Sequence, residues 1–268
     1  MFILYLLAVA VLLGGALVFA LQGRSGHKGL MQLRQFSYAH RGLHRQGVPE
    51  NSIAAFAEAL EKGYGIELDV HLMKDGNLAV IHDSSLKRVA GAEVSIEDLC
   101  ASDLDKYPLQ NTAETIPLFQ DVLSLFAGRA PLIVELKSVG ENYQALCETA
   151  CRMLDGYKGA YCIESFDPRC IRWLRKNRPE IIRGQLSESF RTGKMNPLLA
   201  FVMRWNLTSF WTKPDFIAYR FADRKHFTVS IMRSAWGVQG VSWTIRNLSD
   251  YEQAVNEGWI PIFENFNP

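Results

Sequence analysis

The 268-residue chain has 29 basic and 28 acidic residues, and its formal net charge at neutral pH is +1. This balance lacks the basic excess of a protein that binds nucleic acid through its phosphates. The five cysteines show no C-x-x-C spacing, which argues against a disulfide framework and fits a reducing compartment.

The chain begins with an uncharged apolar run over residues 2–21. Such a run can cross a bilayer as a helix, because about 20 residues at roughly 1.5 Å each span the hydrocarbon layer. A cleaved signal peptide is the alternative, since Val18, Phe19 and Ala20 could form a small-residue cleavage site. No basic residue precedes the run, and this favours an uncleaved transmembrane anchor over residues 1–22.

Basic residues follow the apolar run, at Arg24, Lys28 and Arg34. The positive-inside rule therefore predicts a single-pass membrane protein whose C-terminal domain lies in the cytoplasm. Residues 23–35 are predicted to form a short polar linker between the anchor and this domain.

Residues 36–268 alternate short apolar runs with longer helical patterns, which is typical of a parallel sheet covered by helices. Eight strands in a segment of this length predict a closed (β/α)8 TIM barrel, a fold of about 250 residues. The predicted strands are 36–39, 65–71, 132–136, 160–164, 181–185, 216–219, 240–244 and 260–263. The predicted helices are 52–62, 117–126, 141–155, 168–177, 197–207, 224–236 and 249–257.

The second predicted strand carries the first candidate site. Apolar and acidic residues alternate over residues 66–70, so Glu67 and Asp69 point to the same side. Two carboxylates on one face of a buried strand repel each other and favour a cation between them. A surface hairpin with a solvated acidic face is the alternative, but the apolar run 78–81 favours burial.

A hairpin is predicted to follow this strand. Asp75 and Gly76 are typical of a two-residue turn in which both residues have positive φ. Folding the chain back at this turn pairs Leu72 with Ala79 and Asp69 with His82, which puts an imidazole beside the carboxylates. The returning strand and the loop 84–115 are predicted to form a small insertion after the second strand.

In a barrel of this kind, catalytic groups lie at the C-terminal ends of the strands. Those positions hold three acids, two histidines and two cations: His40, Arg41, Glu67, Asp69, His82, Glu135 and Lys137. Three carboxylates suit Mg²⁺ or Ca²⁺, and two imidazoles can act as base and acid at phosphorus. Arg41 and Lys137 suit phosphate oxygens, while zinc is disfavoured because no H-x-H or Cys-His spacing occurs.

At these residues the sequence resembles the glycerophosphodiester phosphodiesterase family. The matching motifs run in order from Tyr38 to Thr244 and form a specific set. They are His40-Arg41-Gly42, Pro49-Glu50-Asn51-Ser52, Glu67-Leu68-Asp69-Val70, Lys74-Asp75-Gly76, His82-Asp83, Ile116-Pro117, Glu135-Leu136-Lys137, Ser165-Phe166 and Trp243-Thr244.

The resemblance implies a metal-dependent barrel enzyme that hydrolyses glycerophosphodiesters to an alcohol and glycerol 3-phosphate. It implies that His40 and His82 form the catalytic pair. It also implies three metal ligands, two phosphate contacts, an aromatic residue packed on the glycerol and a supporting acid. The implied metal ligands are Glu67, Asp69 and Glu135, and the implied phosphate contacts are Arg41 and Lys137. Trp243 is the aromatic residue on the glycerol, and Glu50 is the supporting acid.

Two departures from the family pattern occur. Met73 stands where the family often has threonine, at a hairpin position expected to be tolerant. The last strand ends in Glu264-Asn265-Phe266-Asn267-Pro268 rather than in Thr-Asp-x-Pro, which alters the rim near the leaving group. The substrate is therefore left open between soluble glycerophosphodiesters and membrane lysophospholipids.

A catalytically silent, membrane-anchored binding module would need a lost ligand or histidine, and none is lost.

The segment 195–211 has two interpretations. Residues 198–203 are apolar without interruption, and Trp205, Trp211, Arg204 and Lys213 resemble residues that settle at a bilayer interface. The segment is expected either to be buried against a neighbour or dimer partner, or to dip into the leaflet that holds the anchor. The sequence indicates no oligomeric state.

Overall fold

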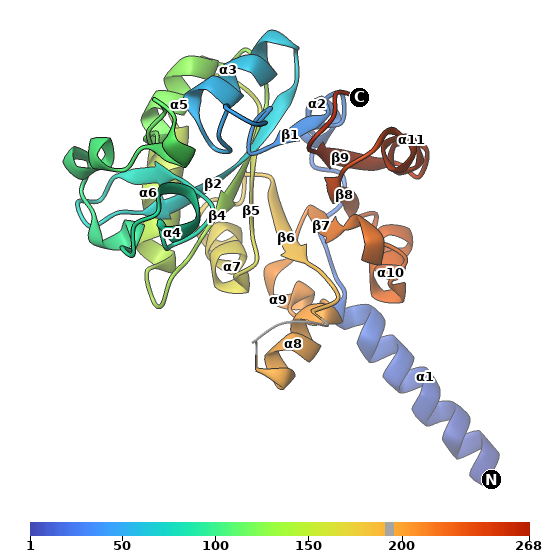
Figure 1. Ribbon diagram of the computed structural model, residues 1–268. Helices are drawn as coiled ribbons and strands as arrows, with labels where there is room; N and C mark the ends of the chain where they lie inside the picture. Colours follow the sequence, from blue (N-terminus) through green and yellow to red (C-terminus); the bar gives the residue numbers. More distant parts are fainter. Residues whose placement is uncertain (191–195) are drawn as a thin grey trace.

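The computed structural model describes residues 1–190 and 196–268, and it confirms the predicted barrel (Figure 1). Eight parallel strands lie in chain order around the ring, and β1 pairs with both β2 and β9, which closes it. Every predicted strand agrees within two residues at each end. The strands are β1 Tyr38–His40, β2 Gly65–Leu72, β4 Leu132–Leu136, β5 Tyr161–Ser165, β6 Arg183–Ser187, β7 Phe216–Arg220, β8 Gln239–Ile245 and β9 Trp259–Phe263.

Helices cover the outside of the ring, and their apolar sides form the main core against the strands. Each predicted helix agrees within three residues at each end. Local sequence accounts for the starts, since Ser52, Asp167 and Asn247 each cap a helix by accepting a backbone N–H. The helices are α3 Ile53–Glu61, α5 Phe119–Phe126, α6 Tyr143–Leu154, α7 Pro168–Asn177, α8 Pro197–Arg204, α9 Ser209–Thr212, α10 Phe227–Trp236 and α11 Leu248–Asn256.

The predicted hairpin register is wrong by one residue. The returning strand, β3 Leu78–Val80, places Leu78 rather than Ala79 opposite Leu72. Within this loop, Gly76 alone has a positive φ, +83°, and its N–H donates to the Met73 carbonyl. The loop therefore has three residues and a left-handed glycine, whereas the prediction required two residues of positive φ.

The insertion after β3 has a hydrophobic cluster of its own. It contains the short helix α4 Lys87–Ala90 and the 3₁₀ turns η1 Ile96–Asp98, η2 Ala101–Lys106 and η3 Leu109–Asn111. Met73, at the hairpin position expected to be tolerant, is buried in this cluster with Ile81. His71 on β2 ties the insertion to the barrel through Glu97, 2.6 Å away.

The segment predicted as a linker, residues 23–35, packs on the base of the barrel. Helix α2 Leu30–Leu33 buries both leucines against the cluster inside the ring. The Arg24 guanidinium makes two contacts with the fully buried Asp215, at 2.5 and 2.6 Å, and donates to the Ile181 carbonyl. Arg24 therefore fixes this segment to the barrel through a buried acid.

The N-terminal helix, α1 Phe2–Ala20, projects away from the barrel and buries none of its side chains (Figure 1). Its length and mean hydropathy of 2.7 are sufficient for a membrane span, and they fit either an anchor or a signal sequence. The barrel domain contacts the C-terminal end of α1, because the Trp236 indole donates to the Val18 carbonyl at 2.9 Å and Leu21 is fully buried.

Replacing Arg24 by alanine should lower the free energy of unfolding by about 3 kcal/mol, because Asp215 would remain buried without its cationic partner. Urea unfolding of the full chain in detergent measures this change. Lys28→Ala is the matched control, since Lys28 is exposed and should change stability by less than about 0.5 kcal/mol. Equal midpoints for the two variants would contradict a structural role for residues 23–35.

Candidate active site

Three carboxylates meet at the mouth of the barrel. Glu67 and Asp69 lie on β2, and Glu135 lies beside Asp69 on the neighbouring β4. The register pairs Glu67 with Ile133, a residue of the interior cluster, so these side chains point into the ring as the alternation predicted. All three are buried, and their ligand atoms lie within 4.8 Å of one another.

Burial and mutual repulsion determine how these acids titrate. Burial raises the pKa of Glu67, and the charges of Asp69 and Glu135 raise it further. Burial also raises the pKa of Glu135 to about 7, with Asp69 acting in the same direction. The pKa of Asp69 is well below its usual value because Lys137 and Arg41 outweigh its burial. The raised pKa values of Glu67 and Glu135 show that the neighbouring cations do not fully compensate the cluster, and its buried oxygen donors fit Mg²⁺ or Ca²⁺.

Two cations already contact the carboxylates. Lys137 Nζ lies 2.7 Å from Glu135 and 3.1 Å from Asp69, and Arg41 Nε lies 3.3 Å from Asp69. Arg41 adopts a left-handed backbone conformation, with φ at +54°, and its backbone N–H donates to the Glu67 carbonyl. Both cations therefore lie where a phosphate bound at the carboxylates would meet them.

A second layer of polar residues holds this arrangement. Glu50 accepts from Arg41 at 2.9 Å and from Arg88 at 2.6 Å. Asn51 donates to Asp69 at 2.9 Å. Glu50 therefore holds Arg41 in place through an ion pair.

His40 is held by an acid from the last strand. Its Nδ1 lies 2.6 Å from Glu264, whose pKa is lowered strongly because His40, His44 and Arg246 outweigh its burial. The ionised Glu264 is an acceptor, so His40 carries its proton on Nδ1 and leaves Nε2 free, 3.8 Å from Glu67. Burial lowers the pKa of His40 despite this contact, and the imidazole is neutral at pH 7.

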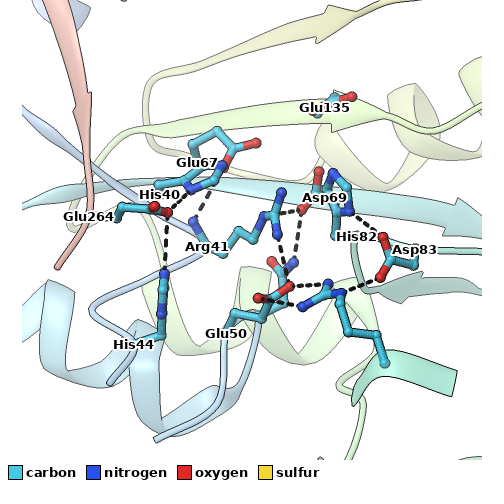
Figure 2. A network of polar contacts seen from close by, with 12 residues as sticks. His40, Arg41, His44, Glu50, Glu67, Asp69, His82, Asp83, Glu135 and Glu264 are labelled. Carbon is cyan, nitrogen blue, oxygen red and sulfur yellow. Dashed lines mark hydrogen bonds and ion pairs between the residues drawn. The ribbon is translucent and has the colours of Figure 1, made fainter. Parts of the chain in front are cut away.

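His82 has a matching arrangement on the other side of the carboxylates. Its Nδ1 lies 2.6 Å from Asp83, and Arg88 contacts Asp83 at 2.5 Å. Burial lowers the pKa of His82 to about 4, so this imidazole is also neutral at pH 7. Figure 2 shows His40 beside Glu67 and His82 beside Asp69, with Arg41 between the two histidines.

A cavity of about 610 Å³ adjoins the carboxylates. Glu135 and Lys137 line its polar end. Phe166, Phe190, Leu199 and Met203 form an apolar part of its wall, and Asp167 and Arg169 also line it. Trp243 packs edge-on against Phe166, with 5.7 Å between the ring centroids, so its ring extends the apolar wall.

The structure brings all nine residues named from the sequence to one end of the barrel, and it adds residues that the sequence analysis did not assign. In the sequence, Glu264 is recognisable only as a departure from the family pattern at the rim. The pairing of β9 with β1 brings it beside His40. Glu164 on β5 is a fourth buried carboxyl beside Glu135, and burial raises its pKa well above the usual value. Asn51 lies in the motif Pro49-Glu50-Asn51-Ser52, but the resemblance assigned no role to it.

His40, His44 and Glu264 form a second group whose potential ligand atoms lie within 4.8 Å of one another. Here Glu264 already contacts His40 and Arg246, each at 2.6 Å. These contacts make the group a hydrogen-bonded support for His40, whereas the three buried carboxylates form a group that could hold a metal ion.

A sequence profile of the glycerophosphoryl diester phosphodiesterase family matches residues 40–266. A glycerophosphodiester phosphodiesterase of Caldanaerobacter subterraneus is 28% identical over 230 residues, which cover 82% of this chain and 89% of that protein. The lysophospholipase D GDPD1 of Rattus norvegicus is 32% identical over 133 residues, which cover 45% of this chain and 41% of that protein.

Among solved structures, the fold is similar to a phosphodiesterase of Oleispira antarctica in complex with its product sn-glycerol-3-phosphate. The TM-score is 0.72 and the identity 20%, and the match covers 85% of this chain and 92% of that one.

Metal binding by the three carboxylates should strengthen as the pH rises through 7. Without an ion, Glu135 has a pKa of about 7 and holds a proton at lower pH, and this proton must leave before the oxygen can bind a metal. Titration calorimetry with Mg²⁺ should show weaker binding and proton release at about pH 6 relative to about pH 8. Glu135→Gln should show a smaller pH dependence, because only the proton on Glu67 then remains to be released, and a constant affinity in the unaltered chain would contradict the account.

Proposed function

The chain belongs to the glycerophosphodiester phosphodiesterase family and is a phosphoric diester hydrolase, and on this premise we propose that it hydrolyses a glycerophosphodiester to an alcohol and glycerol 3-phosphate. The observation that carries the proposal is a cluster of three buried carboxylates flanked by two imidazoles. Each imidazole is held by its own acid through Nδ1. The product bound by the Oleispira antarctica neighbour supports the same substrate class.

Glu67, Asp69 and Glu135 would hold one divalent ion, Mg²⁺ or Ca²⁺. When bound, the ion supplies positive charge to the phosphoryl oxygens. With all three carboxylates ionised, as a bound metal requires, the carboxylates with Arg41 and Lys137 carry one net negative charge, and a divalent ion would make the site net positive. The site then complements the single negative charge of a phosphodiester.

His40 and His82 divide the proton transfers. Nε2 of one neutral imidazole accepts the proton of the nucleophile as its oxygen bonds to phosphorus. The nucleophile is water, or the glycerol 2-hydroxyl with water opening the cyclic phosphate afterwards. The other histidine, protonated when the anionic substrate binds, gives its proton to the oxygen of the departing alcohol as the old P–O bond breaks.

The remaining residues bind and orient the substrate. Arg41 and Lys137 donate to phosphate oxygens, and Glu50 holds Arg41. Trp243 packs on the glycerol, where its contact with Phe166 leads into the apolar cavity.

The apolar cavity supports a second candidate substrate, a lysophospholipid. Phe166, Phe190, Leu199 and Met203 offer an acyl chain a wall that a free glycerophosphodiester would not use. The partial match to a lysophospholipase D agrees with this candidate. A catalytically silent module is disfavoured because both histidines and all three carboxylates are present.

The proposed activity is tested by adding the full chain in detergent to glycerophosphocholine, glycerophosphoglycerol or lysophosphatidylcholine, each with Mg²⁺, Ca²⁺ or EDTA. We expect glycerol 3-phosphate from the first two, or lysophosphatidic acid from the third, with either metal and neither product with EDTA. Full activity in EDTA would contradict the metal assignment. If none of the three compounds is cleaved, the proposed substrate class is contradicted.

Replacing His40 or His82 by alanine should lower kcat by about 10²–10⁴-fold, the usual contribution of a positioned acid or base. Glu264→Gln should also lower kcat and shift the pH–rate profile, because a neutral amide could not hold His40 as the ionised carboxylate does. His27→Ala is the control, since His27 lies in the segment at the base of the barrel, where its ring contacts the Glu180 carbonyl. Near-normal turnover in the His82→Ala variant would contradict the assignment.

We also infer that α1 is an uncleaved anchor and that the domain lies in the cytoplasm. The contact between Trp236 and the Val18 carbonyl supports retention of α1, and five free cysteines agree with a reducing compartment. Protease added outside intact cells should leave the domain whole, and lysis should expose it. Digestion in intact cells would contradict this orientation.

A further inference from the structure

An apolar surface formed by α8, α9 and the start of α10 is left uncovered by the described chain. Its large side chains are between 44% and 72% exposed: Leu198, Leu199, Phe201, Phe210 and Phe227. Helix α8 buries only Met203, so most of its apolar run is left for an occupant outside the described chain, either a partner or the leaflet. We propose that this surface rests in the lipid leaflet that α1 enters.

The surface is continuous across its helices. The Trp205 ring lies 5.4 Å from Phe201 on α8 and 5.1 Å from Phe227 on α10, measured between centroids. Hydrogen bonds anchor the segment from beneath, since Asn206 donates to Thr228 at 3.0 Å and Ser187 donates to the Met203 carbonyl at 2.9 Å. The exposed side chains therefore stand on a packed support.

The position of α1 identifies the occupant. Helices α9 and α10 both contact α1, and α10 runs from Phe227 in the exposed surface to Trp236, which bonds to α1. Figure 1 shows α8 and α9 on the side of the barrel from which α1 leaves. A bilayer that covers the apolar side chains of α1 therefore lies next to this surface.

Basic residues border the apolar ones. Arg204 ends α8, Lys213 follows α9 and Lys225 precedes α10. Exposed apolar side chains with basic neighbours are typical of elements that lie in the headgroup region of a membrane with anionic lipids. This pattern favours a leaflet over a second copy of the chain.

Such docking would place the active-site mouth at the membrane surface. Leu199 belongs to the exposed surface and also lines the cavity beside Glu135, so α8 separates the leaflet from the cavity by one helix. The inference concerns the position of the domain and does not depend on which substrate the proposed reaction uses.

Spin labels on the full chain test the proposal in vesicles of phosphatidylcholine and phosphatidylglycerol. Labels at Leu198→Cys, Phe201→Cys and Phe227→Cys, made in a Cys100→Ser background, are compared with Val255→Cys. Val255 is the matched control because it is 48% exposed on α11, away from α8 in Figure 1. We expect the ratio of oxygen to nickel-chelate collisions to be severalfold higher at the three test positions than at Val255.

A ratio at Leu198 and Phe227 equal to that at Val255 would place the surface in water and overturn the proposal. Strong spin–spin coupling at these positions in both detergent and vesicles, with neither reagent gaining access, would identify a second copy as the occupant and would also overturn it. Neither readout requires activity, so the outcome is separate from that of the proposed function. Because the labels occupy three positions on two helices, the test does not depend on the folding of any single variant.

Discussion

Repulsion among three buried carboxylates is the constraint on which this site depends. Glu67, Asp69 and Glu135 are packed within 4.8 Å of one another, in an interior that is otherwise apolar below them. Buried like charges are stable only with opposite charge nearby, and Arg41 and Lys137 supply part of it. The proposed divalent ion would supply the rest, and a phosphodiester anion would then restore neutrality. The proposed metal, the substrate and the two cations would together balance the charge of the carboxylates.

Closure of the barrel brings together the two histidines to which we assign the acid–base chemistry. Pairing of β1 with β9 brings Glu264, at the end of the chain, beside His40 near the start of the domain. The insertion after β3 holds His82 on the other flank, where His71 contacts the His82 carbonyl and Glu97. In both cases a carboxylate holds Nδ1, so Nε2 is the atom left for chemistry. The two supports come from different elements and converge only in the closed ring.

Much of this was predictable from sequence, because strand alternation and strand ends are local properties. The run 66–70 revealed the direction of Glu67 and Asp69, and the barrel pattern grouped the other candidates at its mouth. The hairpin register was not predictable, since it depended on whether Asp75 would adopt a positive φ. The contact between Glu264 and His40 could not be predicted without knowing that β1 pairs with β9. The packing of residues 23–35 depended on Arg24 meeting Asp215, which is 191 residues away.

Direct observation of a cation is the most decisive measurement for the central claim, that the three carboxylates are a metal site. Crystals of the full chain grown with Mn²⁺, which substitutes for Mg²⁺ and scatters anomalously, would locate the ion. The account predicts one anomalous peak bounded by Glu67, Asp69 and Glu135. A peak among His40, His44 and Glu264 with none at the carboxylates, or no peak at either group, would contradict it.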